Sequence, residues 1–196
     1  GPPYDAARQF YGLNDTEPLD WVAGVIAAGP DDIRSRLRPG LKAYLLIVNT
    51  PNECVIGGKA EDVESLVISL GKAFLPLHGV TMAHCETGKP VEQPYRELHT
   101  LPVAKLPKLK VYSGAWGRAY QLTSSNAAES ITAGLLNTID FPKVVETAYR
   151  EGVRAFIEVG PGNSCTRMIT AILGQRPGFA RAICVPRQAG VSNLLK

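Results

Sequence analysis

One stretch near the C-terminal end, residues 155–173, constrains the fold of this chain more than any other. Residues 155–159 are mostly apolar and predict a buried strand, and Gly160, Pro161 and Gly162 predict a turn with little room for side chains. A helical pattern follows directly after this turn. The order strand, glycine turn and helix brings backbone N–H groups to the rim of a sheet, where ligands bind in open α/β proteins. The stretch therefore predicts an α/β core with a binding rim at these three turn residues.

Composition excludes several classes of protein. The chain has 196 residues, enough for one substantial domain or two small ones, and its 45% hydrophobic and 20% charged residues are ordinary for a globular protein. The net charge of +3 is scattered, and the densest basic cluster, at 105–110, is short, so we expect no nucleic-acid partner. No apolar stretch approaches the roughly 20 residues that span a bilayer, and no secretory signal pattern occurs, so we expect no membrane partner.

Four cysteines, Cys54, Cys85, Cys165 and Cys184, are widely spaced along the chain. No CxxC pair occurs, so we expect no zinc or other metal site. Four cysteines in 196 residues do not make a disulfide framework either, which indicates a reducing, cytoplasmic compartment. The first two residues, Gly-Pro, are typical of a protease-cleavage scar, so we expect the chain to be part of a longer protein.

The first half of the chain predicts a small α+β subdomain over residues 41–84. Strands are predicted at 41–48 and 54–56, an amphipathic helix at 60–74, and an apolar extended segment at 75–82. This order of strand, strand, helix and strand indicates a ferredoxin-like subdomain.

The residues on either side of this subdomain are assigned to a second region. Residues 1–40 are predicted to be a linker or a helical segment of an α/β core, and residues 85–196 to be the C-terminal part of that core and a tail. Helices are predicted at 125–136 and 141–151. The strand at 155–159 is apolar on consecutive positions, which indicates a strand covered on both faces. Because this chain has few other strands of that kind, we expect the parallel neighbours of this strand to come from outside the chain.

His84 is the strongest candidate for a chemically active side chain. The residues around it predict a histidine at the end of a strand, with rigid support behind it and open space in front, as a general base requires. The same pattern is also typical of a packed or surface histidine. Its neighbour Cys85 would point to the opposite face of a strand, so the two cannot form a Cys–His dyad. Cys165, near a helix start, is open to two interpretations, a thiol of lowered pKa or a core side chain.

A set of features along the chain follows the order found in a known family. Its first part is an Asn-x-Pro turn, a strand, a helix, and a small residue followed by histidine, at Asn49-Thr50-Pro51, 54–58, 60–74 and Ala83-His84. Its second part is a helix, an aromatic residue, a helix ending in glycine and a Glu-Val-Gly-Pro-Gly motif, at 125–136, Phe141, 142–152 and 158–162. The ordered set, over about residues 41–173, resembles the second half of acyltransferase domains of the malonyl-CoA:ACP transacylase type, in fatty-acid and polyketide synthases. The motifs are most similar to those of polyunsaturated fatty acid synthases.

The resemblance implies a fold class and a reaction. The fold is α/β, with a ferredoxin-like small α+β subdomain plus the C-terminal part of an α/β-hydrolase-like acyltransferase core. The reaction loads acyl groups, malonyl or related, from coenzyme A onto the phosphopantetheine of an acyl carrier protein through a Ser–His dyad, without a bound cofactor. His84 would be the general base, and a backbone carbonyl at or near Gly134 would orient its ring. Asn49 matches an active-site asparagine, and Met82 occupies a position that partly sets the choice of extender unit.

The nucleophile of this family is absent from the chain. It lies in a Gly-His-Ser-x-Gly motif, and no Gly-x-Ser-x-Gly occurs here. Ser113 and Ser164 lack that framing, and Arg8 is too isolated to match the family's carboxylate-binding arginine. The resemblance assigns both groups to the first half of the domain, so the expected partners are that N-terminal half, adjacent synthase domains and an acyl carrier protein. Two alternatives stay open: a non-catalytic structural or docking module of a megasynthase, and an unrelated hydrolase with a Ser–His dyad.

Overall fold

The computed structural model describes residues 5–14, 16–79, 81–104 and 108–185. The Gly-Pro pair at the start and the first part of the basic cluster lie outside the described residues. The chain divides into two compact units, residues 1–144 and 145–196, and each is described by itself. Within the described part of the chain, every helix is too short or too polar to span a membrane.

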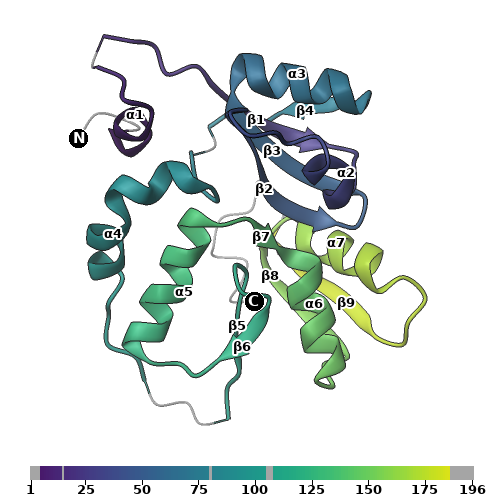
Figure 1. Ribbon diagram of the computed structural model, residues 1–196. Coiled ribbons are helices and arrows are strands. Elements are labelled where there is room, and N and C mark those ends of the chain that lie inside the picture. The colour runs from purple at the N-terminus through teal and green to yellow at the C-terminus, as the bar shows by residue number, and fades with distance from the viewer. Residues whose placement is uncertain (1–4, 15, 80, 105–107, 186–196) are drawn as a thin grey trace. The chain divides into compact units, whose positions relative to one another are not determined.

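The first unit contains a five-stranded sheet with the strand order β4-β1-β3-β2-β7 (Figure 1). Neighbouring strands are antiparallel, except that β2 and β7 run parallel. That parallel pair is joined through the long chain segment between the two strands, as a parallel connection requires. The strands are β1 (Trp21–Ile26), β2 (Ala43–Thr50), β3 (Glu53–Lys59), β4 (Phe74–Pro76) and β7 (Ile139–Asp140).

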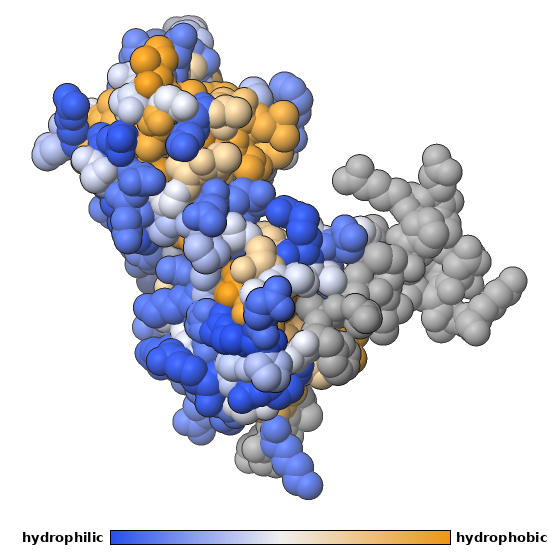
Figure 2. Space-filling model, turned by 90° about the vertical axis from the view of Figure 1, so that its right-hand side faces the viewer, coloured by the Kyte–Doolittle hydropathy of each residue, from blue (hydrophilic) through white to orange (hydrophobic). Residues whose placement is uncertain are grey.

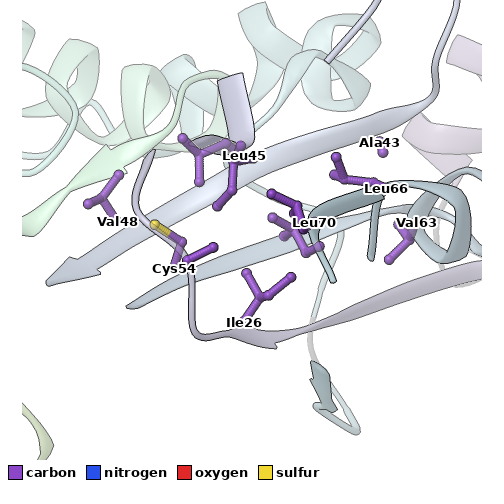
Figure 3. Close-up of a cluster of buried hydrophobic side chains, with 11 residues drawn as sticks. Ile26, Ala43, Leu45, Val48, Cys54, Val63, Leu66 and Leu70 are labelled. Carbon is purple, nitrogen blue, oxygen red and sulfur yellow. The ribbon is translucent and has the colours of Figure 1, made fainter. Parts of the chain in front are cut away.

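Two helices, α2 (Pro30–Arg34) and α3 (Ala60–Leu70), pack with the strands in the main core of this unit (Figure 3). Val63, Leu66 and Leu70 are spaced three and four residues apart, so they share one side of α3 and face the strands. The buried residues of this core are Ile26, Ala28, Ile33, Ala43, Leu45, Val48, Cys54, Ile56, Val63, Leu66 and Leu70.

A second, smaller core contains strand residues that alternate with those of the main core, so it lies on the opposite face of the sheet. Trp21 and Tyr44 stack there, with their ring centroids 6.1 Å apart. Close approach of the chain to β3 requires a glycine at position 58, because a Cβ on Gly58 would overlap the carbonyl oxygen of Lys42. The buried residues of this second core are Ala23, Leu46, Val55 and Cys85.

The helix α5 (Ser124–Leu136) is the longest of the first unit, and Thr123 caps its start by accepting a hydrogen bond from the N–H of Asn126. The strands β5 and β6 form a short antiparallel pair. The other elements are α1 (Asp5–Tyr11), the 3₁₀ helix η1 (Glu86–Val91), α4 (Glu92–Leu98), β5 (Val111–Ser113), β6 (Arg118–Tyr120) and α6 (Phe141–Arg150), which continues into the second unit.

The second unit contains a parallel strand–helix–strand arrangement. β8 (Ala155–Pro161) and β9 (Phe179–Val185) pair in parallel along their whole length, and α7 (Ser164–Leu173) lies in the connection between them. Parallel neighbours need such a crossover because a tight turn reverses the direction of the chain.

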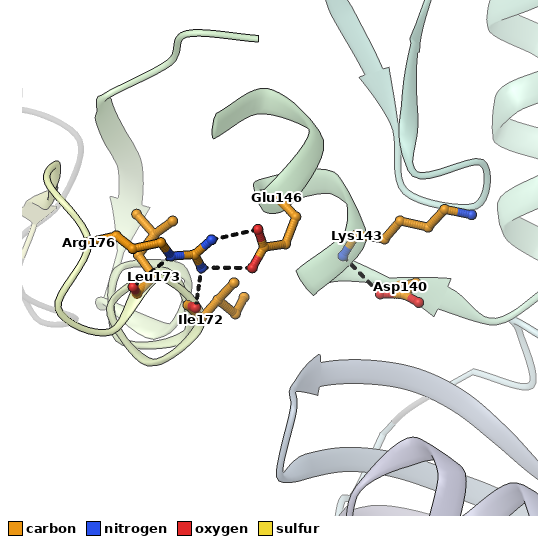
Figure 4. A network of polar contacts seen from close by, with 6 residues as sticks. All are labelled: Asp140, Lys143, Glu146, Ile172, Leu173 and Arg176. Carbon is orange, nitrogen blue, oxygen red and sulfur yellow. Dashed lines mark hydrogen bonds and ion pairs between the residues drawn. The ribbon is translucent and has the colours of Figure 1, made fainter. Parts of the chain in front are cut away.

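An ion pair links the end of α7 to α6 within this unit (Figure 4). The guanidinium of Arg176 donates two hydrogen bonds of 2.7 Å to the carboxylate of Glu146. It also donates to the carbonyl oxygens of Ile172 and Leu173, the last residues of α7. These carbonyls have no partner inside the helix, so Arg176 both caps α7 and joins it to its neighbour.

Several boundaries predicted from the sequence are wrong. The sheet begins at Trp21 and not at residue 41, because β1 lies between β3 and β4. Residues 1–40 therefore contain a strand and a helix of the small subdomain, and not only a linker or a segment of another core. The segment predicted as extended at 75–82 is a strand only as far as Pro76. The ends of these strands depend on pairing with strands that are distant along the chain, so local composition does not predict them.

The region around β8 also differs from the prediction. The strand continues through Gly160 and Pro161, where the sequence predicts a turn. A parallel neighbour, β9, lies within this chain, whereas the sequence indicates that all such neighbours come from outside. One face of β8 is uncovered, because Ile157 and Val159 are 62% and 70% exposed, so the prediction of cover on both faces is not met by this chain alone.

Candidate functional site

His84 is held against the last turn of α5. Its Nδ1 atom lies 2.5 Å from the carbonyl oxygen of Gly134. Its backbone N–H donates to the carbonyl oxygen of Leu135 at 2.7 Å, and the N–H of Cys85 donates to the same oxygen at 3.2 Å. The last four carbonyls of a helix have no partner within it, so the end of α5 offers acceptors for three donors from one short segment.

These contacts determine which ring nitrogen of His84 carries the hydrogen. A carbonyl oxygen only accepts hydrogen bonds, so Nδ1 must donate to Gly134. In the neutral ring the lone pair is then on Nε2, which points away from this contact. An imidazole arranged in this way can accept a proton at Nε2 while its orientation is held from behind.

The backbone at His84 is in the left-handed region, with φ of 67°. Among the described residues it is the only one other than glycine with a positive φ. Such a conformation costs free energy in a residue with a side chain and is found where surrounding contacts enforce it. Here the three hydrogen bonds to α5 enforce it. The prediction that His84 ends a strand is therefore wrong, since its support comes from the carboxyl end of a helix.

A cavity of about 330 Å³ lies beside His84, within the first unit. Leu136, Asn137 and Thr138 line one part of it, and Tyr44 and Glu86 line another. The segment after α5 is fixed to the sheet here, because the hydroxyl of Thr138 donates to the carbonyl of Leu45 at 2.6 Å.

Two side chains at this cavity stay uncharged. Burial raises the pKa of Tyr44, whose hydroxyl lies 3.4 Å from that of Tyr11 and 3.5 Å from the carboxylate of Glu86. Burial also raises the pKa of the Cys85 thiol, which lies 3.1 Å from the hydroxyl of Thr87. Cys85 is therefore a packed thiol and not a nucleophile beside His84.

The remaining predicted site residues lie elsewhere in the fold. Asn49, near the end of β2, donates to the carboxylate of Glu53 at 3.1 Å and does not line the cavity beside His84. Met82 lines a different cavity, of about 230 Å³, together with Trp21 and Pro76. The structure thus brings His84 and Gly134 into contact and leaves Asn49 and Met82 outside that contact.

The turn residues Gly160, Pro161 and Gly162 belong to the second unit, and the helix start that follows them is already capped. The carboxylate of Glu158 accepts hydrogen bonds from the N–H of Cys165 at 3.1 Å and from the N–H and hydroxyl of Thr166 at 2.7 and 2.8 Å. These bonds lower the pKa of Glu158. The sequence predicts that N–H groups at this helix start are open to a ligand. Two of them, those of Cys165 and Thr166, are instead bonded to the carboxylate of Glu158.

Glu158 also decides between the two interpretations of Cys165. Burial and the nearby charge of Glu158 raise the pKa of the Cys165 thiol, so this cysteine is not an activated one at a helix start. Nothing in the local sequence marks Glu158 as a cap, because it lies inside the apolar run and precedes the helix by several residues. Within the described residues, no three His, Cys, Asp or Glu side chains gather in a way that suits a metal ion.

Comparison with known proteins gives sequence relatives among multidomain synthases. No family model matches the chain. The chain is 24% identical over 185 residues to a subunit of the polyunsaturated fatty acid synthase of a Thraustochytrium species, which covers 87% of this chain and 9% of that protein. It is 26% identical over 160 residues to a subunit of the phenolphthiocerol/phthiocerol polyketide synthase of Mycobacterium tuberculosis, covering 79% of this chain and 10% of that protein. The chain thus spans about a tenth of the length of these relatives.

Solved structures share the fold. The acyltransferase domain of the second module of the salinomycin polyketide synthase superimposes with a TM-score of 0.72 at 18% identity, over 91% of this chain and 42% of that one. A malonyl-transacylase solved with its type II polyketide synthase acyl-carrier protein gives 0.74 at 21% identity, over 91% and 58%. The transacylase of Clostridium perfringens gives 0.70 at 22% identity, over 90% and 57%. The resemblance to acyltransferase domains and the predicted fold class are confirmed, and the chain spans about half of these solved chains.

Proposed function

We propose that this chain carries the histidine of a Ser–His dyad in an acyltransferase that moves acyl groups from coenzyme A to an acyl carrier protein. The observation that supports the proposal is the contact between Nδ1 of His84 and the carbonyl of Gly134. This contact leaves Nε2 as a proton acceptor without a carboxylate partner. The serine would lie on a part of the acyltransferase domain outside these 196 residues.

The proposed reaction has two halves. In the first, Nε2 of His84 takes the serine proton while the serine oxygen attacks the thioester carbon; the C–S bond breaks and the thiolate of coenzyme A takes the proton back. In the second, the phosphopantetheine thiol of the carrier protein gives its proton to Nε2 and attacks the acyl-serine, and the released serine oxygen recovers that proton. The ring is briefly positive in each half, and the carbonyls at the end of α5 lie against it, where a positive charge is stabilised.

Support for these substrates comes from the relatives. The transacylase of similar fold was solved with an acyl-carrier protein, and the sequence relatives are parts of fatty-acid and polyketide synthases. Asn49 and Met82 stay proposed contributors to substrate binding, and Gly160, Pro161 and Gly162 would contribute through the shape of the backbone. A cytoplasmic location likewise stays a prediction.

The tautomer of His84 can be measured on the chain as it is. We expect long-range ¹H–¹⁵N NMR spectra to show the hydrogen on Nδ1, because the carbonyl of Gly134 accepts it. A hydrogen on Nε2 would remove the proton acceptor and contradict the proposed dyad.

We also expect the chain alone to remain unacylated on any hydroxyl after incubation with malonyl-CoA or acetyl-CoA, because it has no Gly-x-Ser-x-Gly motif. Intact-mass spectrometry followed by peptide mapping checks this. Acyl groups on cysteine do not count, because thiols acylate without catalysis. A stable malonyl ester on a serine of this chain would show that the nucleophile lies within it.

Acyl transfer is tested in a joined protein made of two parts. The first part is the segment of the C. perfringens transacylase that does not superimpose on this chain, and the second part is residues 1–196. We expect His84→Ala to slow transfer to the carrier protein by about 10²–10⁴, the usual loss for a general base. His99→Ala is the matched control, because Nδ1 of His99 also lies close to a backbone carbonyl, that of Tyr95 at 2.7 Å. A folded His84→Ala protein with normal transfer, or a folded joined protein with none, would favour a structural module instead.

A further inference from the structure

One face of β8 is apolar and uncovered. Side chains of a strand alternate between its two faces, so Ala155, Ile157 and Val159 share one face and Phe156 and Glu158 share the other. The face with Glu158 lies toward α7, whose first N–H groups bond this carboxylate. On the opposite face all three residues are exposed, Ile157 to 62% and Val159 to 70%. A strand whose outer face meets water ordinarily carries polar residues there.

The pairing of β8 makes this exposure more unusual. β8 and β9 form a two-stranded parallel sheet within the described residues. Parallel sheets occur almost only with both faces covered by helices, because each crossover places a helix on one face or the other. Two strands alone are also marginally stable in water. The arrangement of β8, α7 and β9 therefore has one of the two covering layers that such a sheet requires.

The chemistry of the face restricts what can cover it. Ala155, Ile157 and Val159 carry no charge and no hydrogen-bonding group, so nothing on this face would recognise a nucleic acid, a phosphate or a charged peptide. It suits an apolar stripe of a helix, which packs on a parallel sheet at these alternate positions.

The comparisons indicate where such a helix comes from. The superposition covers 90% or more of this chain but only 42% to 58% of three solved acyltransferase chains. About half of the fold thus consists of residues that this chain does not contain. We propose that the Ala155–Ile157–Val159 face of β8 is the docking surface for a helix of that other half of the acyltransferase fold. The proposal rests on the fold and does not depend on the acyl transfer proposed above.

A matched control residue exists in the first unit. Ile68 on α3 is 73% exposed, but it is a single isoleucine on the outer side of a helix whose inner side is packed. Figure 2 shows hydrophobic surface over the upper part of the molecule, where α3 and the edge strand β4 lie. A general effect of removing exposed apolar groups would therefore appear at Ile68 as well.

The first experiment uses the chain alone. The double variant Ile157→Thr/Val159→Thr keeps β-branched side chains, and therefore the strand, while making the face polar. We expect the wild-type chain to bind the dye anilinonaphthalene sulfonate, the double variant to lose most of that binding, and Ile68→Thr to keep it. Equal binding by all three proteins would overturn the proposal, because the face would then not be an open apolar surface.

The second experiment identifies the occupant with the joined protein described above. We expect carbene footprinting to label Ile157 and Val159 strongly in the chain alone and weakly in the joined protein. Labelling that is equally strong in both proteins would overturn the proposal. A concentration-dependent dimer of the chain alone that the double variant abolishes would assign the face to a second copy. Increased labelling after deletion of residues 186–196 would assign it to the chain's own C-terminal segment.

These outcomes are separate from those of the proposed reaction. A joined protein in which the face is protected but no acyl group is transferred supports the docking surface and contradicts the enzyme. A joined protein that transfers acyl groups while Ile157 and Val159 stay fully labelled supports the enzyme and contradicts the docking surface.

Discussion

The mainly antiparallel sheet of the first unit and the parallel pair β8–β9 of the second bury their apolar residues to very different extents. Ile26, Ile33 and Ile56 of the first region are 0% exposed, whereas Ile157 and Val159 of the second are 62% and 70% exposed. Both regions are rich in β-branched apolar residues. The difference therefore comes from what covers them and not from their composition.

The connections of the two sheets explain this difference. β2 and β3 are antiparallel neighbours separated by two residues, so a hairpin supplies each strand with its partner from the adjacent chain. The covering helices α2 and α3 are also close in sequence to the strands they cover. Parallel strands instead depend on crossovers, and helices that are distant in the sequence complete the second layer. A region of the first kind can complete its core from its own sequence, and a region of the second kind depends on more of the chain.

The largest effect expected from this comparison is that of Ile56→Ala. Ile56 is completely buried in the main core, so removing three methylene-sized groups should leave a cavity and lower the free energy of unfolding by about 2–5 kcal/mol. Urea unfolding followed by tryptophan fluorescence checks this, because both tryptophans, Trp21 and Trp116, lie in the first unit.

Ile157→Ala is the paired variant for that measurement. Because this isoleucine is 62% exposed, its truncation in the chain alone should change the free energy of unfolding by less than about 0.5 kcal/mol, measured by hydrogen exchange of β8. An equal loss of free energy of unfolding at residues 56 and 157 would contradict the difference in burial between the two regions.

A smaller effect, confined to the second unit, is expected from Glu158→Gln. Hydrogen bonds from the N–H and hydroxyl of Thr166 lower the pKa of Glu158, and the N–H of Cys165 contributes further. Since the folded-state pKa lies below the unfolded one, the cap stabilises the folded unit at pH values above the unfolded pKa and is lost as the pH falls through the folded pKa. Hydrogen exchange of the amides of Cys165 and Thr166 should therefore speed up in acid and already be fast in the variant at neutral pH.

The first unit supplies the control for this pH dependence. The N-cap of α5 is the hydroxyl of Thr123, which does not titrate, so the amide of Asn126 should keep its protection through the same acid range. Parallel loss of protection at Asn126 and Thr166 would show general acid unfolding and not the titration of Glu158.

A further small effect in the second unit is expected from Glu146→Gln. The hydrogen bond from Arg176 lowers the pKa of Glu146, but the side chains of Arg176 and Glu146 are 38% and 39% exposed, so solvent screens the pair. We expect a loss of about 0.5–1 kcal/mol in the second unit, decreasing with added salt. The more exposed pair of Arg34 and Asp31 in the first unit should contribute less, which Asp31→Asn tests. A cost that does not change with salt would indicate that packing of Arg176, and not the ion pair, links α6 to α7.

Much of the fold could be predicted from the sequence where local pattern decides it. The helix predicted at 125–136 is α5 at Ser124–Leu136, and that at 141–151 is α6 at Phe141–Arg150. Apolar periodicity and capping residues act within a few residues of chain, so they report such elements directly. The strand β1 has no such signal beyond being apolar, because its partner β3 begins 27 residues after the end of β1 and no local pattern encodes that pairing.

Part of the candidate site could also be predicted from the sequence, and part could not. The contact of His84 with Gly134 follows from the order of motifs in the resemblance, and the two residues do meet, while their catalytic roles stay predictions. The left-handed backbone of His84 had no sequence signal, because histidine is not a residue that requires a positive φ. The hydrogen bonds from the N–H groups of His84 and Cys85 to the carbonyl of Leu135 had none either.

The sequence by itself determined several of the helices and strands, among them α5 and α6, which residues are apolar enough to be buried, and that no Gly-x-Ser-x-Gly motif occurs in the chain. Only the tertiary structure decided that the backbone of His84 is left-handed, that Glu158 caps α7, and that one face of β8 is left open. The reason is the range of the interactions. Propensity and periodicity act between residues three or four positions apart, whereas these three features depend on groups from separate elements that meet only when the chain is folded.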